Sequence, residues 1–282
     1  RRTSRRLLCA AALVAAVAAA PSPAEAREPG RDEIAIGWSP RAVLRRDAIP
    51  SPLPYAGAAV ASGVLRCGRT RGANAHRVEL GVLQATLRSQ PDYGYLHWPD
   101  GAPQTTSGSP LTYARVRYAY LRQLARSDAF ALRLGPGLDV DIQKLEYVHH
   151  PSSIGGYFGA FALDARAEFE LQLAPRHRLT ATVAVPLFAW VTRSPYATND
   201  DEQLWANRDH SGLRTFGRYV AAGDLQTWNR YQALRLDLRY DLALSEHWAL
   251  SPGVGARILA NQTPRPLVAQ EYGVTLAVTA SF

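Results

Sequence analysis

The chain has 282 residues, 47 % of them hydrophobic, and carries 32 basic against 24 acidic side chains, a net charge of +8. Every basic residue except Lys144 is Arg, and beyond the first residues these arginines are scattered among Asp and Glu. No basic block stands alone in the body of the chain, which argues against a nucleic-acid-binding class.

Residues 1–26 have the pattern of a secretory signal peptide. Four arginines in the first six residues precede a run of about 14 apolar residues, Leu7 to Ala20, and the small-x-small sequence Ala24–Ala26 follows a Pro-rich break. The apolar run is shorter than the roughly 20 residues of a spanning helix. We therefore expect cleavage after residue 26, export, and a mature chain of residues 27–282. That chain keeps one cysteine, Cys67, which we expect as a small residue packed at a strand end.

The segment 27–75 has two interpretations. Ile34, Ile36 and Trp38 alternate with small residues, and the Gly- and Ala-rich stretch 55–66 follows the Pro-rich loop 50–54. The favoured interpretation makes these stretches the first two strands of a ten-stranded barrel. The alternative is a periplasmic or plugging extension of an eight-stranded barrel. Pro40 fits a strand only at an edge or bulge, which weakens the first interpretation slightly.

The rest of the chain alternates between apolar and polar residues with period two, the pattern of strands with one apolar face. In 157–173, for example, Phe161, Leu163 and Phe169 alternate with charged residues. Eight such segments are present: 76–89, 111–124, 128–146, 157–173, 177–193, 230–244, 247–260 and 268–282.

The length of these segments favours a membrane barrel over a soluble sandwich. Several exceed the soluble mode of about 5–6 residues and match the roughly 9–11 that a tilted strand needs in lipid. Short turns at 125–127, 175–176 and 245–246 alternate with longer links at 90–110, 147–156, 194–227 and 261–267. Short periplasmic turns and long outer loops are typical of outer-membrane barrels. We predict an all-β, closed, antiparallel up-and-down barrel in the bacterial outer membrane.

The final segment agrees with this prediction. Tyr272, Val274, Leu276, Val278 and the terminal Phe282 share one face. The segment resembles the terminal strand of bacterial outer-membrane proteins. That resemblance implies that Phe282 is an assembly signal, read by the barrel-assembly machinery.

Charged residues gather on the faces predicted to line the lumen. Both signs occur in nearly equal number, so we expect a salt-bridge network that fills the barrel, with a hydrated pore as the alternative. The predicted network comprises Arg115, Arg117, Arg133, Asp139, Asp141, Asp164, Arg166, Glu168, Glu170, Arg235, Asp237, Arg239 and Asp241, and its inward set extends to Arg257 and Glu271.

Candidates for catalysis are few. His149 and His150 lie in one long link, and Asp209 and His210 in another. The chain resembles outer-membrane proteases of the omptin type and outer-membrane lipid A deacylases in architecture alone. No local motif matches either family, so no catalytic residue is carried over. We expect no metal and no cofactor, and an enzyme is the less favoured interpretation.

Aromatic residues near strand ends are expected to anchor at the membrane interface: Tyr113, Tyr157, Trp190, Trp228, Tyr231 and Trp248. The leading functional hypothesis is a structural or binding barrel whose loops 90–110 and 194–227 meet an extracellular ligand. The alternatives are a narrow channel for small or hydrophobic solutes and a rim-sited hydrolase acting on lipid or peptide. Outer-membrane lipid and lipopolysaccharide are the expected partners, and a monomer is the expected state.

Overall fold

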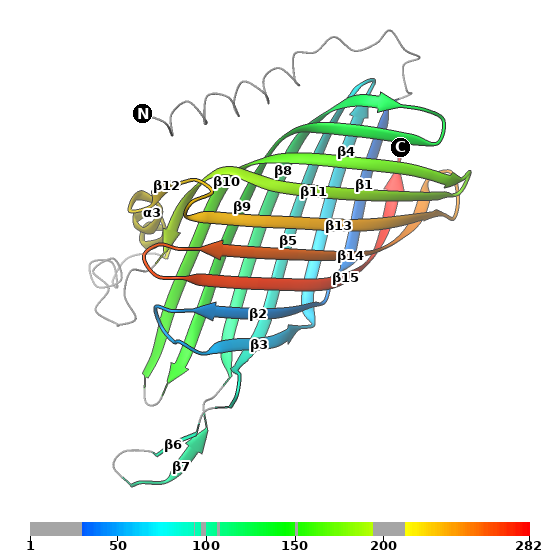
Figure 1. Cartoon of the computed structure of the whole chain (residues 1–282). Coiled ribbons are helices and arrows are strands. Elements are labelled where there is room, and N and C mark those ends of the chain that lie inside the picture. The colour runs from blue at the N-terminus through cyan, green and yellow to red at the C-terminus, as the bar shows by residue number, and fades with distance from the viewer. Residues whose placement is uncertain (1–29, 93, 97–99, 106–107, 150–151, 194–211) are drawn as a thin grey trace, which may run out of the picture.

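The computed structural model describes residues 30–92, 94–96, 100–105, 108–149, 152–193 and 212–282. The signal-peptide prediction falls outside these residues. Within them the chain forms a closed antiparallel barrel of ten strands, as predicted (Figure 1). The wall is built from β1 (Arg31–Trp38) with β2 (Arg41–Asp47), β3 (Pro54–Ala59) with β4 (Ala61–Arg71), β5 (Asn74–Ser89), β8 (Ser109–Arg126), β9 (Phe130–His149), β10 (Ser152–Ala174), β11 (His177–Arg193), β13 (Tyr231–Ala243), β14 (Trp248–Asn261) and β15 (Leu267–Ser281).

The first two wall strands are each broken once. Between β1 and β2 the chain passes Ser39 and Pro40, and Pro40 has no N–H to give to the ladder. Its carbonyl still accepts a bond from Val274 N at 3.2 Å. In the next strand the break falls at Val60, beyond which inward residues fall on even rather than odd positions. The described part of this segment, from β1 to β4, is thus part of the wall, and Pro40 occupies the interruption that its chemistry requires.

The barrel closes where the first and last strands meet. β1 pairs with β15 through Ile34 opposite Ala280, and β2 continues the same seam with Val43 opposite Glu271. Phe282 follows β15, and its backbone N–H donates to the Asp32 carbonyl at 3.0 Å. Closure gives backbone donors and acceptors partners within the wall, the condition for crossing lipid with strands.

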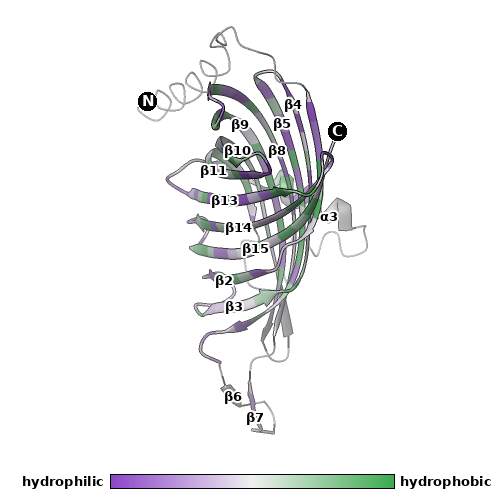
Figure 2. Cartoon of the chain, turned by 90° about the vertical axis from the view of Figure 1, so that its right-hand side faces the viewer, coloured by the Kyte–Doolittle hydropathy of each residue, from purple (hydrophilic) through white to green (hydrophobic). Residues whose placement is uncertain are grey.

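The two faces of the wall have opposite character. Large apolar side chains point outward on every side and stay exposed, such as Val82 at 62 %, Val254 at 54 % and Leu276 at 52 %. Buried arginines and carboxylates point into the lumen. Figure 2 shows the resulting alternation of apolar and polar residues along the strands. A soluble protein buries its apolar face, so this inverted arrangement identifies a barrel that faces lipid.

The connections also differ between the two ends. At one end β4–β5, β8–β9, β10–β11 and β13–β14 join by tight turns, and in such barrels short turns mark the periplasmic side. At the other end the β5–β8 link carries the hairpin β6 (Gly94–Leu96) and β7 (Pro103–Thr105), which projects beyond the barrel (Figure 1). The β11–β13 link carries the helix α3 (Gly212–Ala221) and β12 (Asp224–Gln226). No helix among the described residues is long and apolar enough to cross a membrane.

Two predictions about local structure are wrong. The link predicted over 147–156 is mostly strand, because β9 runs to His149 and β10 begins at Ser152. Cys67 lies within β4 rather than at a strand end. It stands opposite the outward-facing Ile34 and Val78. In the first case the apolar alternation ends at Gly and His residues, which favoured a loop. A hairpin that extends beyond the membrane needs no lipid-facing apolar row, so the strands continue without that pattern.

Candidate functional site

The centre of the lumen holds a cluster of paired charges from opposite walls. Glu271 on β15 accepts hydrogen bonds from Arg115 at 3.2 Å and Arg257 at 3.1 Å. Arg257 also pairs with Asp141, and the Tyr113 hydroxyl lies 3.4 Å from Glu271. These side chains are at most 6 % exposed. Charges buried this deeply need partners of opposite sign, and this cluster supplies them across the barrel.

A second layer of ion pairs lies next to it. Asp139 faces Arg117 at 3.4 Å and Arg235 at 3.7 Å, and Glu79 lies 3.0 Å from Arg66 and pairs with Arg117 as well. Each carboxylate is therefore shared between two guanidinium groups. Sharing of this kind ties five strands, β4, β5, β8, β9 and β13, together through side chains in addition to the backbone ladder.

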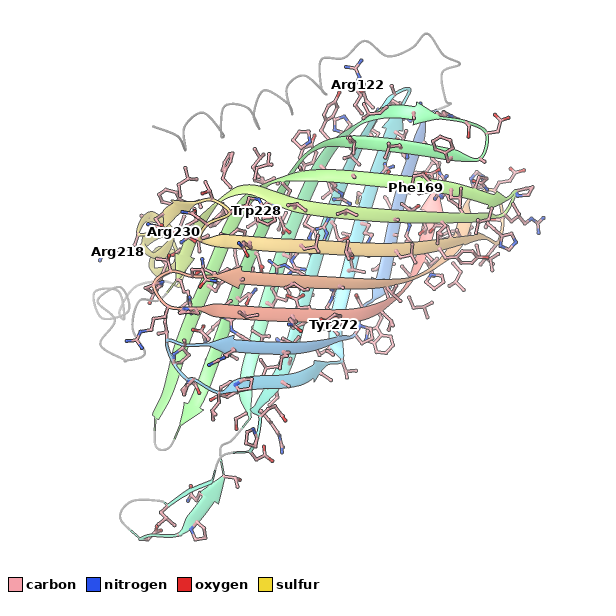
Figure 3. All side chains as sticks on the ribbon, in the orientation of Figure 1. Arg122, Phe169, Arg218, Trp228, Arg230 and Tyr272 are labelled. Carbon is pink, nitrogen blue, oxygen red and sulfur yellow. The ribbon has the colours of Figure 1, made fainter. Side chains whose placement is uncertain are left out.

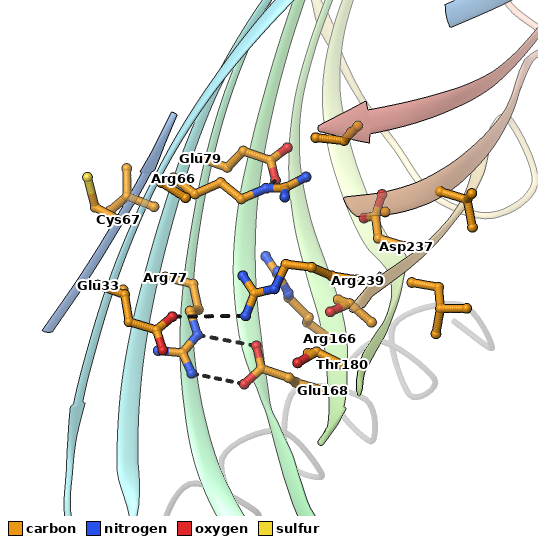
Figure 4. Close-up of a pocket in the computed structure, with 18 residues that line it drawn as sticks. Glu33, Arg66, Cys67, Arg77, Glu79, Arg166, Glu168, Thr180, Asp237 and Arg239 are labelled. Atoms are coloured by element: carbon orange, nitrogen blue, oxygen red, sulfur yellow. Dashed lines mark hydrogen bonds and ion pairs between the residues drawn. The ribbon is translucent and has the colours of Figure 1, made fainter. Parts of the chain in front are cut away.

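The periplasmic half of the lumen continues the pattern. Glu168 accepts from Arg77 at 3.0 Å and Arg133 at 3.2 Å. Arg178 joins Glu33 at 3.1 Å to Asp241 at 2.9 Å. The close-up in Figure 4 shows the first of these pairs, with dashed lines joining Arg77 to Glu168. The network thus extends from the centre of the barrel to its periplasmic mouth.

The thirteen charged residues of the predicted network all lie on lumen-facing positions of β8, β9, β10 and β13. Most of them make the ion pairs just described. Asp164 and Arg166 do not, since neither has an ion pair or hydrogen bond among the described residues. These two neighbours on β10 are the unpaired members of the set.

Sequence reasoning missed the part of the network that comes from the other strands. Adding these residues changes the balance of charge, because arginines now exceed carboxylates by fourteen to eleven. The added residues are Arg31, Arg41, Arg45, Arg66, Arg77, Arg178 and Arg193 with Glu33, Asp47 and Glu79. The interruptions in β1–β4 concealed six of them, and only the pairing of residues across strands reveals which way those six point. The other four lie on β5 and β11, where the alternation itself places them on the inward face.

Two apolar clusters, with the buried ion pairs of Asp47 to Arg45 and Arg193, occupy the extracellular half of the lumen. One joins Tyr55, Leu83, Leu87, Leu111 and Leu145, and it includes Tyr113 beside the central ion pairs. The other gathers Phe158, Val191, Tyr231, Leu259 and Leu267. Tyr113 and Tyr231 thus point inward, and their predicted place at the membrane interface is wrong. Two cavities in the lumen measure about 70 Å³ and 20 Å³.

The exposed Trp residues of the prediction do lie at strand ends. Trp190 donates to Val220 O at 2.8 Å and Trp228 to Pro186 O at 2.6 Å, and both rings remain more than a third exposed. The Thr192 hydroxyl donates to Tyr219 O, and Asn261 donates to Gln226 at 2.6 Å. These bonds fix α3 and β12 against the extracellular end of the barrel. Figure 3 shows Arg218, Trp228 and Arg230 toward this end of the barrel.

The catalytic candidates are not brought together in the described structure. His149 ends β9, but its side chain lies outside the described residues, as do His150, Asp209 and His210. Among described residues no group of three or more His, Cys, Asp and Glu could hold a metal ion.

No known family model matches the sequence, and no curated protein matches it. Solved bacterial outer-membrane barrels are similar in overall shape. The translocator domain of the autotransporter NalP from Neisseria meningitidis has 9 % identity, full coverage of this chain, 95 % coverage of its own and a TM-score of 0.46. The transport unit of the autotransporter AIDA-I from Escherichia coli has 6 % identity, 97 % coverage of each chain and a TM-score of 0.42.

The toluene transporter TodX from Pseudomonas putida has 8 % identity, coverages of 95 % and 93 %, and a TM-score of 0.33. Similarities this low carry no argument about what this chain does. The closed barrel with its apolar exterior is the architecture of bacterial outer-membrane proteins, and the chain is a protein of that membrane.

Proposed function

We propose that this protein is a non-conducting barrel that binds its ligand at its extracellular end. The observation that supports this is the filling of the lumen. Ion pairs occupy the centre and the periplasmic half, and two apolar clusters together with the ion pairs of Asp47 occupy the extracellular half. A channel needs a continuous path wide enough for water, and small barrels fill theirs with side chains.

The segment between β11 and β13 is the best candidate for the binding surface. Its helix and short strand are held by hydrogen bonds to the barrel, so the segment presents a fixed surface. Arg218 is exposed there, and Arg230 is 53 % exposed with Asp224 as an ion-pair partner at 3.5 Å. An exposed pair of this kind is weak and gives up its partner readily. Trp228, 46 % exposed, lies toward the same end of the barrel (Figure 3).

This combination fits the phosphate-bearing headgroup of lipopolysaccharide. Guanidinium groups bind phosphate oxygens through paired hydrogen bonds. Trp rings favour the boundary between headgroups and acyl chains, where one part of the ring is apolar and the N–H is polar. The Arg218, Trp228 and Arg230 cluster therefore has the chemistry for the headgroup that surrounds an outer-membrane protein on its outer face.

Two experiments test the proposal. The first is conductance of the purified protein in planar lipid bilayers, where we expect no channel steps above the lipid baseline. Regular steps would establish the channel alternative instead. The sample must first show a heat-modifiable band on unboiled gels, so that silence is measured on a folded barrel.

The second experiment measures lipopolysaccharide binding by the folded protein in detergent micelles. Replacing both Arg218 and Arg230 with Gln should weaken binding by a factor of ten or more, because two charge-assisted contacts are lost. The control is Arg69→Gln, which removes an exposed arginine with one carboxylate partner at the periplasmic end. Equal affinity of the double variant and the control would refute the assignment of this surface.

A further inference from the structure

Three arginines face outward near the periplasmic ends of closely spaced strands. Arg69 and Arg71 lie on β4 and Arg122 on β8, at alternate positions that continue the outward rows of these strands. Figure 3 shows Arg122 toward the end of the barrel opposite Arg218 and Arg230. At the same level the outward positions of β9, β10, β13, β14 and β15 carry aliphatic or aromatic side chains. The outward arginines at this end therefore gather on one side of the described wall.

The strand register brings these arginines onto one patch. Arg71 and Arg122 stand on either side of Asn74, which lies on the intervening strand β5. Arg69 stands in the next outward row toward the membrane, opposite His76. Neighbouring strands lie about 4.8 Å apart, so the backbones of Arg71 and Arg122 are about 10 Å apart. Their long side chains can reach a group that lies between them. We call Arg69, Arg71, His76 and Arg122 the periplasmic basic patch.

One carboxylate offsets part of this charge. Asp32 on β1 lies 3.0 Å from Arg71 and 3.8 Å from Arg69. These three side chains are between 37 % and 64 % exposed, so the ion pairs are weak and exchange readily with another anion. The turn after β8 adds Arg126 and Asp128, one residue of each sign. The patch therefore keeps an excess of positive charge.

Two tyrosines indicate that the patch lies at the level of the lipid headgroups. Tyr118 and Tyr120 flank the His76 ring, with ring centroids 6.1 Å and 5.3 Å away. The Tyr118 hydroxyl lies 2.9 Å from His76 Nδ1, and the Tyr120 hydroxyl donates to the Asn74 side chain at 2.9 Å. Tyr rings favour the boundary at which the ring meets acyl chains and the hydroxyl meets headgroups. Arg122 follows on the same outward row, on the side where the lipid phosphates lie.

We propose that the periplasmic basic patch binds the phosphate-bearing headgroup of an anionic phospholipid in the periplasmic leaflet. Guanidinium groups pair with phosphate oxygens through charge-assisted hydrogen bonds. The excess of positive charge favours a headgroup with a net negative charge over a zwitterionic one. The acyl chains would lie along the outward row of β5, where Val78, Leu80 and Val82 are 37 %, 41 % and 62 % exposed. This site is independent of the extracellular surface proposed above.

The test measures phospholipid binding to the folded barrel in detergent micelles by native mass spectrometry. Short-chain phosphatidylglycerol should bind more tightly than phosphatidylcholine with the same acyl chains. Replacing both Arg69 and Arg122 with Gln should raise the dissociation constant for phosphatidylglycerol about 30-fold, because each arginine near an anionic headgroup contributes roughly a factor of five. The control replaces Arg46 and Arg88 with Gln. It removes two outward arginines at the extracellular end and should leave that constant unchanged.

Three outcomes overturn the proposal. Equal affinity of the unmodified protein for the two lipids would mean that the patch does not recognise net charge. A loss of the same size in both double variants would indicate general attraction to a cationic surface. Displacement of the lipid by an equal concentration of inorganic phosphate would mean that the patch recognises the free anion.

Two further measurements keep the test decisive. If the Arg69 and Arg122 double variant does not give a heat-modifiable band, Arg69→Gln alone is measured, and the expected loss is about five-fold. An unchanged dissociation constant in that single variant refutes the site. The double variant should keep its affinity for lipopolysaccharide, because the residues proposed for that ligand lie at the other end of the barrel. The two proposals therefore fail separately.

Discussion

Glu271 is the residue at which the stabilising role of the lumen network can be measured most directly. It is 4 % exposed and accepts hydrogen bonds from Arg115, Arg257 and the Tyr113 hydroxyl. Glu271→Gln keeps the shape of the side chain and removes its charge. Arg115 then keeps only carboxylates at 3.7 Å and 3.9 Å, and Arg257 keeps only Asp141.

Removing one member of a buried ion pair typically costs about 3–5 kcal/mol. The unfolding equilibrium constant should therefore rise roughly 100- to 5000-fold, since each 1.4 kcal/mol corresponds to about a factor of ten. Reversible urea unfolding in lipid vesicles, followed by Trp fluorescence and by the shift between folded and unfolded gel bands, gives this constant.

The control is Asp32→Asn at the periplasmic end of β1. Asp32 is 37 % exposed and pairs with Arg71 at 3.0 Å, and such surface pairs contribute at most about 1 kcal/mol. If Glu271→Gln costs no more than Asp32→Asn, the lumen contains enough mobile water to solvate the arginines. The claim of a closed lumen would then fail, and with it the main support for a non-conducting barrel.

Three further predictions concern the wall and its assembly. Gly135→Ala should prevent the heat-modifiable band from forming, because the added Cβ would lie 1.9 Å from the Tyr120 carbonyl oxygen. The control Gly81→Ala, with open space at that position, should fold normally. Leu238→Arg on the lipid-facing side of β13 should lower the free energy of unfolding in urea by about 2–4 kcal/mol. Val268→Arg, beside Arg46 near the extracellular boundary, should lower it by at most about 1 kcal/mol. Equal losses would contradict the placement of the membrane. Phe282→Ala should reduce the amount of folded barrel recovered from cells and leave refolding of the purified protein unchanged, since the exposed ring is expected to act in assembly. A refolding defect would instead indicate a structural role.

The wall could be predicted from the sequence because lipid imposes a strict pattern. A strand in a bilayer must show apolar residues on alternate positions for its whole membrane length, and β11 begins and ends at the predicted residues 177 and 193. Where the strand leaves the membrane this requirement ends. The extensions of β9 and β10 toward His149 and Ser152 carried no such pattern, so they were predicted as a loop.

The lumen was harder to predict because its contents depend on which strands face each other across the barrel. Period-two patterning places Arg115 and Glu271 on inward faces, but their 3.2 Å contact joins strands far apart in the sequence. The interruption at Val60 changes which positions of the second wall strand point inward, so Arg66 could not be assigned from alternation alone. Tyr113 and Tyr231 have the composition of interfacial anchors, and only their position on inward faces excludes that role.

The shared carboxylates of the lumen also restrict how this protein can change over evolutionary time. Glu79 pairs with arginines on β4 and β8, and Glu168 pairs with arginines on β5 and β9. Loss of either carboxylate therefore removes an ion-pair partner from two buried arginines. Viable replacements at these positions must therefore come in correlated sets on different strands. The β6–β7 hairpin projects away from the barrel, and its described residues make none of these lumen ion pairs (Figure 1). Among relatives of this chain, the hairpin is free to diversify one residue at a time, whereas the interior is expected to covary as a block.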